Sequence, residues 1–238
     1  MNARRALPFL SIALLASTAQ AAEPGRYVLA LSWQPAFCET APDRPECRGA
    51  EPAALVLHGL WFDGADAWCR APEATRKALN ERPMCRLDAV PLPPSLRREL
   101  DAAMPGGRSC LDRREWWKHG VCSHESAESY YRDSLALLGR LAEGALARLL
   151  AARAGAAASS AELCEALAAD LGDGFRRAVR LVASKVEGRR LLSEIRITLD
   201  APDGVLALDA ARLGAARGRP PSCDPRDVYA VDAAGRSR

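Results

Sequence analysis

The run ALVLHGLW, residues 54–61, is apolar except for one histidine, and it predicts a buried strand with a glycine near its end. A strand is also predicted upstream, at RYVLALSW (26–33). Downstream, SEIRITL (193–199) alternates apolar with polar side chains, which is typical of a half-buried strand. A shorter strand is expected at 227–231. The predicted strands therefore lie towards both ends of the chain.

Helices are predicted between these strands. One begins at PPS (93–95), and residues 129–150 carry apolar side chains at helical spacing. After an Ala- and Gly-rich break at 151–160, SSAE (159–162) has the form of a capping box and starts a helix that Gly172 ends. This order predicts an α+β fold, in which packed helices cover a central antiparallel or mixed sheet.

The first 21 residues are expected to be a signal peptide. Two arginines precede an apolar run (6–16) that is too short to span a bilayer, and AQA (19–21) has the small residues of a cleavage site. The alternative is a buried helix of the core. We expect residues 22–238 to form one domain in the periplasm or the external medium. No later stretch is long and apolar enough to predict a membrane helix.

The net charge of the chain is +3, and removal of the two leader arginines would leave +1. A protein that binds many phosphates usually carries a clear basic excess. Any positive charge used to bind nucleic acid must therefore be local.

The cysteines predict disulfides, because their number is even and the chain is expected to be exported. A zinc site is the alternative, but no CxxC pair occurs. The first two cysteines flank a short proline-rich loop and are the simplest pair to expect. The eight are Cys38, Cys47, Cys69, Cys85, Cys110, Cys122, Cys164 and Cys223.

Two of the three histidines stand in unusual surroundings. His58 lies near the end of the first quoted strand, and His119 lies in REWWKHGVC (114–122). Histidine is the side chain best suited to exchange protons near neutral pH. Each of the two is therefore a candidate catalytic group, although a histidine at the end of a strand is also often a buried residue of the core.

A helical arrangement of residues 111–119 would gather three polar groups. At about 100° per residue, Glu115, Lys118 and His119 share one face, and Trp117 points to the opposite side, where it can anchor the helix in the core. The glycine after His119 would let the chain turn. Lys118 could stabilise charge on a phosphate, and Glu115 could orient its neighbours or share a proton with a phosphate oxygen. The alternative is a solvated surface pair.

The two segments together resemble the active-site motifs of the ribonuclease T2 family, whose usual forms are close to HGLWP and HEWxKHGTC. The resemblance is greatest to the bacterial periplasmic ribonuclease I branch, and it covers nearly the whole mature chain outside about 124–185. The segments that carry it are HGLW (58–61), LSWQPAFC (31–38), RPEC (44–47), MPGGRSCLDRREWWKHGVC (104–122), LLSEIRITL (191–199) and PSCDPRDVYAVDAAG (221–235).

The resemblance implies an α+β fold around an antiparallel sheet, and cleavage of single-stranded RNA with little base preference and no metal or cofactor. The RNA 2′-hydroxyl would attack the adjacent phosphorus and leave a 2′,3′-cyclic phosphate, so DNA would not be cut. By similarity His119 would be the base and His58 the acid, while Glu115 and Lys118 would stabilise the pentacoordinate phosphate.

Further site residues follow by similarity. Trp61 would stack on a base and Asp63 would accept a hydrogen bond from one, although core packing is the alternative for Trp61. Arg114 stands where many members carry a third, phosphate-binding histidine; an arginine can bind phosphate, or can simply be solvated. Phe62 replaces the usual proline.

Disulfide pairs are also implied by the resemblance. Cys164 would pair with Cys223, although family members often carry the first cysteine of this pair near Ser184. Cys69, Cys85, Cys110 and Cys122 would form two more bridges.

Two other functions remain open on the sequence. A non-catalytic RNA-binding or signalling protein could keep the same fold, but it would have no need of both proton-transfer groups. A metallohydrolase could use His58, His119 and a carboxylate. We expect a monomer whose partner is single-stranded RNA, and no membrane association once the leader is removed.

Overall fold

The computed structural model describes residues 21–49, 53–63, 67–80 and 84–233, and nearly all of the expected leader falls outside these ranges. A six-stranded sheet forms the centre of the described chain, in the order β2-β1-β5-β6-β3, with β4 paired to β5. The strands are β1 (Gly25–Trp33), β2 (Leu55–Phe62), β3 (Ala156–Ser159), β4 (Val179–Val186), β5 (Arg189–Ala201) and β6 (Val228–Val231).

The four predicted strands are confirmed as β1, β2, β5 and β6, and the α+β fold class is confirmed with them. The pairs are antiparallel except for a short parallel contact between β5 and β6. Two strands were not predicted. β3 has the sequence AAAS, and it pairs with β6 inside the Ala-rich segment that was expected to be a break. Alanine has little strand propensity, so the pairing partner decides this element.

The helices expected to begin near 93 and 159 are present, whereas those at 34–40, 73–80 and 175–178 were not predicted. No helix in the described ranges is long and apolar enough to cross a bilayer. Short 3-10 turns occur at Pro45–Cys47, Met84–Arg86 and Pro105–Ser109. The helices are α1 (Gln34–Thr40), α2 (Glu73–Asn80), α3 (Pro94–Ala103), α4 (Leu111–Glu115), α5 (Val121–Ser123), α6 (Ala127–Ala142), α7 (Ala145–Ala152), α8 (Ser160–Leu171) and α9 (Phe175–Ala178).

The helical pattern over residues 129–150 proved to be two helices, because the chain breaks at Gly144. The Asp170 carboxylate accepts hydrogen bonds from the backbone N–H groups of Ala145 and Leu146, at 2.6 and 2.9 Å, and so caps the start of α7. A Cβ at Gly144 would lie 2.5 and 2.7 Å from the two carboxylate oxygens of Asp170. The break therefore depends on a residue of α8 that local periodicity cannot reveal.

The capping box at the start of α8 is confirmed. The Ser159 side chain accepts from the backbone N–H of Glu162 at 3.2 Å, and the Glu162 carboxylate accepts from the backbone N–H of Ser159 at 2.8 Å. Two otherwise unpaired donors of the helix end are satisfied in this way.

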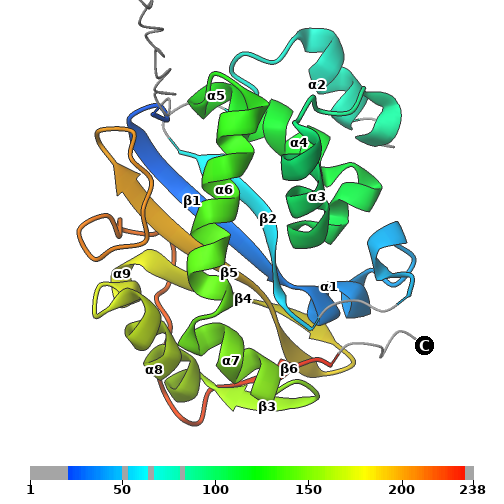
Figure 1. Cartoon of the computed structure of the whole chain (residues 1–238). Helices are drawn as coiled ribbons and strands as arrows, with labels where there is room; N and C mark the ends of the chain where they lie inside the picture. The colour runs from blue at the N-terminus through cyan, green and yellow to red at the C-terminus, as the bar shows by residue number, and fades with distance from the viewer. Residues whose placement is uncertain (1–20, 50–52, 64–66, 81–83, 234–238) are drawn as a thin grey trace, which may run out of the picture.

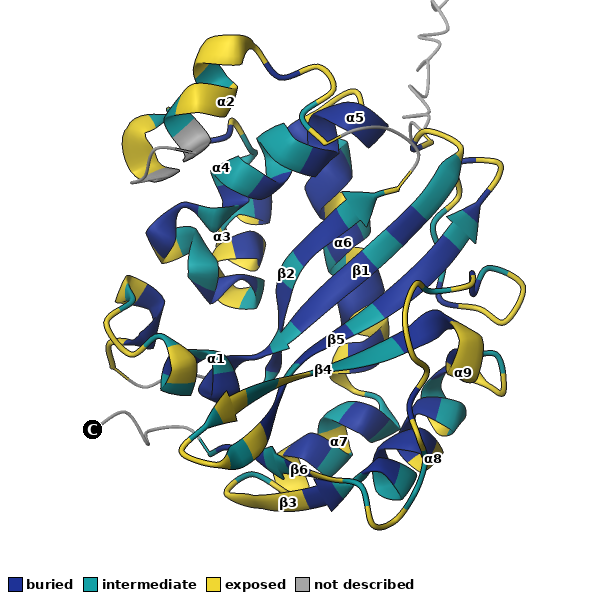
Figure 2. Cartoon of the chain, turned by 180° about the vertical axis from the view of Figure 1, so that it is seen from behind, coloured by how far each residue is buried: buried dark blue, intermediate teal, exposed yellow. Residues whose placement is uncertain are grey.

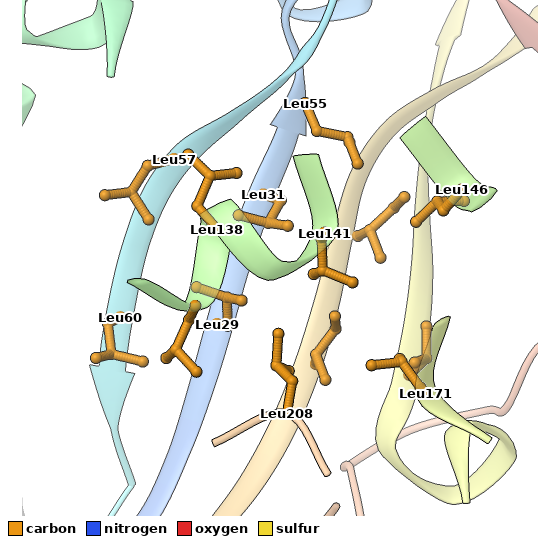
Figure 3. Close-up of a cluster of buried hydrophobic side chains, with 14 of the residues drawn as sticks. Leu29, Leu31, Leu55, Leu57, Leu60, Leu138, Leu141, Leu146, Leu171 and Leu208 are labelled. Carbon is orange, nitrogen blue, oxygen red and sulfur yellow. The ribbon is translucent and has the colours of Figure 1, made fainter. Parts of the chain in front are cut away.

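The core lies between the sheet and α6, which crosses one face of β1, β2 and β5 (Figure 1). Leucines from the strands interdigitate with leucines of α6 (Figure 3), and their burial supplies most of the driving force for folding. Figure 2 views the sheet from the opposite side, where β1 and β5 lie in front. That second face of the sheet carries the polar residues considered below.

Four disulfides use all eight cysteines. They are Cys38–Cys47, Cys69–Cys122, Cys85–Cys110 and Cys164–Cys223. The expected pairing of the first two cysteines is confirmed, and so is the pairing of Cys164 with Cys223. The remaining four cysteines form two bridges, as the resemblance implied.

The four bridges should contribute unequally to stability. The Cys164–Cys223 bridge spans 59 residues and Cys38–Cys47 spans 9. A longer loop restricts the unfolded chain more, so the chain-entropy relation gives about 4 kcal/mol for the first bridge and about 2.5 kcal/mol for the second. Urea unfolding of the two paired Cys→Ala variants should reproduce this order. Equal losses, or a larger loss for the short loop, would contradict it.

Candidate active site

A β-bulge places His58 on the face of the sheet opposite α6. Ala30 pairs with Gly59 and Leu31 pairs with Leu57, so His58 is the extra residue on β2. The bulge interrupts the alternation of the strand. Leu57 and Leu60, three residues apart, therefore both enter the core (Figure 3), while His58 and Trp61 share the other face with their rings 5.3 Å apart.

Tyr130 of α6 supports this part of β2 from the core side. Its hydroxyl donates to the backbone oxygen of Leu60 at 3.0 Å and accepts from the Leu60 backbone N–H at 3.2 Å. One buried side chain thus pairs both backbone groups next to the bulge.

The second motif forms an irregular helix. After α4, a π-helical turn covers Trp116–Gly120 and leads directly into α5. Such wider turns are rare and often occur at functional sites. The expectation that Gly120 turns the chain is wrong, because Gly120 has helical dihedral angles (φ −61°, ψ −46°). Its lack of a side chain serves packing instead, since a Cβ would collide with the ring of Trp116 and lie 3.1 Å from Tyr130.

The wider turn also changes which tryptophan anchors the helix. Trp116 packs against the main core, with its ring 6.0 Å from that of Tyr130. Trp117, the expected anchor, is half-buried and contacts a small cluster around Cys110. The nine-residue α-helix assumed for 111–119 is therefore corrected to a short α-helix followed by a π-turn.

The two motifs meet where Trp61 contacts Glu115. The indole Nε1 donates to Oε2 of Glu115 at 2.8 Å. A Cβ at Gly59 would collide with that same oxygen and lie 3.0 Å from the indole nitrogen, so only glycine leaves room for the contact. The ring of His119 stacks on Trp61 at 5.8 Å, and His58 meets Trp61 edge-on. One indole therefore contacts both histidines and the carboxylate.

The two histidines have opposite electrostatic surroundings. Burial lowers the pKa of His119, and the charges of Lys118 and Arg114 lower it further, to about 3. Burial would also lower the pKa of His58, but the hydrogen bond that its ring donates to Glu194 and the charges of Glu115 and Glu194 outweigh it, so this pKa is raised. At neutral pH His119 is therefore neutral, whereas the surroundings of His58 favour its protonated form more than water does.

Glu115 and Lys118 complete the predicted group. Glu115 is buried, and burial raises the pKa of its carboxyl group despite the opposing effects of His58, Trp61 and Lys118. Lys118 is partly exposed, and it is close enough to act electrostatically on both Glu115 and His119. The structure thus brings His58, Glu115 and His119 into contact with Trp61, and places Lys118 near Glu115 and His119.

The loop after β2 is held against the π-turn. The backbone N–H of Trp68 donates to the Lys118 oxygen at 2.9 Å, and the neighbouring Cys69 is bonded to Cys122. Trp68 itself has a left-handed backbone, with φ at 72°. The bridge and the hydrogen bond together hold this unfavourable conformation beside the site.

The expected substrate-binding residues lie in two separate hollows. Arg114 and His58 line a cavity of about 270 Å³. Trp61 and Asp63 line another of about 200 Å³, where Asp63 forms an ion pair with Arg217 at 3.2 Å.

Glu194 was missed by the sequence analysis. It was assigned to the polar side of a half-buried strand, but Glu194 is itself buried, and its Oε1 lies 2.5 Å from Nδ1 of His58. Its alternation with isoleucines shows only that it faces away from the core. The contact depends on the pairing of β5 with β1 and β2, which no local pattern encodes.

The third histidine has a structural place. His124 is 3% exposed, with Nδ1 2.7 Å from the Ser123 hydroxyl and Nε2 3.2 Å from Asp133. Ser123 is completely buried, so this Ser-His-Asp arrangement gives no substrate access. Within the described ranges, no group of three or more histidine, cysteine or acidic residues could hold a metal ion.

Comparisons with known proteins identify the family and the fold of the chain. Residues 25–206 match the model of the Ribonuclease T2 family. The chain is 32% identical to Ribonuclease I of Escherichia coli (strain K12) over 257 residues, covering 96% of this chain and 94% of the relative. A solved structure of the self-incompatibility associated SF11-RNase of Nicotiana alata has a TM-score of 0.58 at 16% identity, covering 90% of this chain and 100% of that one. Ribonuclease MC1 from bitter gourd seeds has a TM-score of 0.53 at 20% identity, covering 80% and 97%.

The histidines should titrate far apart in an NMR experiment. His58 should titrate above 6.5, and His119 should stay neutral down to about pH 3. Since the unfolded chain would protonate His119 below 6.5, its contribution to stability should be lost as pH falls from 6.5 towards about 3. His119→Gln should remove this part of the pH dependence. An ordinary titration of His119 near 6.5 would contradict the geometry.

Proposed function

Because this chain belongs to the ribonuclease T2 family and is an endoribonuclease, we propose that it cleaves single-stranded RNA by metal-independent transphosphorylation, with little base preference. The proposal rests on the two histidines, one from each motif. Both rings contact Trp61, and their surroundings shift their pKa values in opposite directions. RNA cleavage of this kind needs one proton acceptor and one proton donor.

His119 is the base and His58 the acid in the proposed reaction. Neutral His119 takes the proton of the 2′-hydroxyl as that oxygen attacks phosphorus. Protonated His58 gives its proton to the 5′-oxygen as the bond from phosphorus to that oxygen breaks. The products are a 2′,3′-cyclic phosphate and a free 5′-hydroxyl. The lowered pKa of His119 and the raised pKa of His58 support this assignment and not the reverse.

Glu115 and Lys118 stabilise the pentacoordinate phosphate. The Lys118 ammonium offsets the charge that develops on the phosphate oxygens. Since the pKa of Glu115 is raised by burial, this carboxyl group can hold a proton and share it with a phosphate oxygen. Its Oε2 already accepts from Trp61, which fixes the orientation of the group.

Substrate contacts are proposed for the two hollows on either side of the motifs. Arg114 binds a phosphate beside His58, where a guanidinium can offer two donors. Trp61 and Asp63 contact a base in the other cavity. Stacking on an aromatic ring tolerates any base, which supports weak base preference.

Export is proposed from the leader pattern and the disulfides. We infer that residues 1–21 are removed and that residues 22–238 act as one monomeric domain. Four disulfides suit the oxidising environment of the periplasm or the external medium.

The decisive experiment is incubation of the mature protein with a short single-stranded RNA and the matching DNA, in EDTA, with products identified by mass. RNA fragments ending in 2′,3′-cyclic phosphate, with intact DNA, are expected. His58→Ala and His119→Ala should each lower the rate by about 10²- to 10⁴-fold while RNA still binds, because each removes one proton transfer.

Other outcomes would overturn the proposed mechanism. Cleavage that requires added metal would indicate a metallohydrolase. Tight RNA binding without any cleavage would indicate a non-catalytic binding protein. Near-wild-type cleavage by either histidine variant would refute the assigned roles.

Gly59→Ala should impair cleavage without removing any functional group. The added methyl would displace the Glu115 carboxylate or the Trp61 indole, and a shift of about 1 Å in an active site can cost on the order of 10²-fold in rate. Gly139→Ala is the matched control, because a Cβ at Gly139 meets nothing within 4 Å. Steady-state kinetics of the two variants should differ by that factor. Equal activity would show that the Gly59 contact is dispensable.

A further inference from the structure

One carboxylate outside both motifs is buried against the site. Glu194 of β5 is 6% exposed, and both of its oxygens are engaged. Oε1 lies 2.5 Å from Nδ1 of His58, and Oε2 accepts from Nε of Arg196 at 2.5 Å. Burial would raise the pKa of Glu194, but the hydrogen bonds and charges of His58 and Arg196 outweigh it and lower this pKa. Glu194 is therefore ionised and accepts the Nδ1 proton of His58.

The sheet register brings the two residues together across β1. Ser32 of β1 pairs with Glu194 on one side. On the other side, the bulge at His58 falls between the pairs made by Ala30 and Leu31. His58 and Glu194 thus flank the same part of β1, and the bulge turns the imidazole to the face that carries the carboxylate.

The contact also belongs to a longer chain of interactions. Arg196, bonded to Glu194, has its guanidinium 4.9 Å from the ring centroid of Trp61. Trp61 in turn donates to Glu115. Glu194 is therefore connected to His58 directly, and through Arg196 and Trp61 to the buried carboxyl group of Glu115.

We propose that Glu194 is the positioning residue for His58, holding its Nδ1–H so that Nε2 faces the scissile phosphate and delivers the proton to the leaving oxygen. This inference rests on the proposed function, in which His58 is the general acid. The carboxylate does two things. It fixes the tautomer and rotation of the ring, and it stabilises the imidazolium form that burial alone would disfavour.

A purely structural ion pair is the competing explanation. Removing two charged groups from water costs free energy that their attraction often only balances, so apolar residues would serve packing as well. Glu194 contacts only Nδ1 of the His58 ring. The other ring nitrogen, Nε2, makes no hydrogen bond to the described residues and remains available to a substrate. The two explanations differ in what they predict for proton donation.

Three variants distinguish the effect of Glu194 on the orientation of His58 from the effect of its charge, and both from the loss of any ion pair on β5. Glu194→Ala removes the acceptor, and Glu194→Gln keeps an acceptor but removes the charge. Asp200→Asn is the matched control, because Asp200 lies on the same strand and bonds Arg26 instead of His58. On the dinucleotide UpA, kcat should fall about 10²-fold in Glu194→Ala and less in Glu194→Gln, with KM little changed and Asp200→Asn near wild type.

A substrate with a better leaving group gives the sharpest test. The nitrophenolate of uridine 3′-(4-nitrophenyl phosphate) leaves without a proton, so both Glu194 variants should cleave it within about threefold of wild type. On UpA, the alkaline limb of the pH–rate profile should move to lower pH, because His58 loses its proton more readily without the carboxylate. A purely structural defect would lower the rates on both substrates alike and leave the limb in place.

The inference and the proposed function can fail separately. An NMR titration should show a lower His58 pKa in Glu194→Gln than in wild type, whether or not RNA is cleaved. An unchanged His58 pKa would overturn the positioning role, as would a folded Glu194→Ala variant with wild-type kcat on UpA. Failure of the wild-type protein to cleave either substrate would instead refute the proposed function.

Discussion

The hydrogen bond from the Trp61 indole to the buried Glu115 carboxylate joins the two halves of the site. It connects a strand with a helix that is 54 residues away in sequence, and the rest of the arrangement depends on it. Gly59 must lack a side chain to admit the carboxylate. Tyr130 must pair the backbone of the same strand from the core. The site is therefore built on the packing of α6 against the sheet and is not a surface addition to it.

On either side of this hydrogen bond, the fold gives two chemically identical imidazole rings different charged neighbours. His119 shares its helix with two cations, whereas His58 reaches a carboxylate contributed by β5. The cations near His119 belong to its own segment, whereas the carboxylate at His58 comes from a distant strand. These different surroundings suit one ring to accept a proton and the other to donate one, as the proposed two-proton transfer requires.

Sequence patterns predicted those helices and strands whose position depends on neighbouring residues in the chain. The capping box at Ser159 and the main strands of the sheet were recognised, because side-chain spacing and end signals are encoded within a few residues. The motif residues were recognised through their resemblance to a family. The bulge at His58, the π-turn after Glu115 and the contact made by Glu194 were not predicted, since each is determined by strand register or by packing against distant segments. The break at Gly144 also depends on a distant segment, because the Asp170 carboxylate of α8 caps the start of α7.

The bulge at His58 has a consequence for how the gene can change. Loops accept insertions and deletions readily, and strands accept many substitutions. Loss of the His58 codon would remove the extra residue and leave Leu60 and Trp61 on their present faces, because Gly59 would then follow Leu57 in an unbroken ladder. If the bulge were straightened with every residue kept, Leu60 would leave the core and Trp61 would enter it. A deletion that makes this strand regular therefore keeps its packing and removes the histidine, so length variation at this point should be absent among related chains that keep the activity.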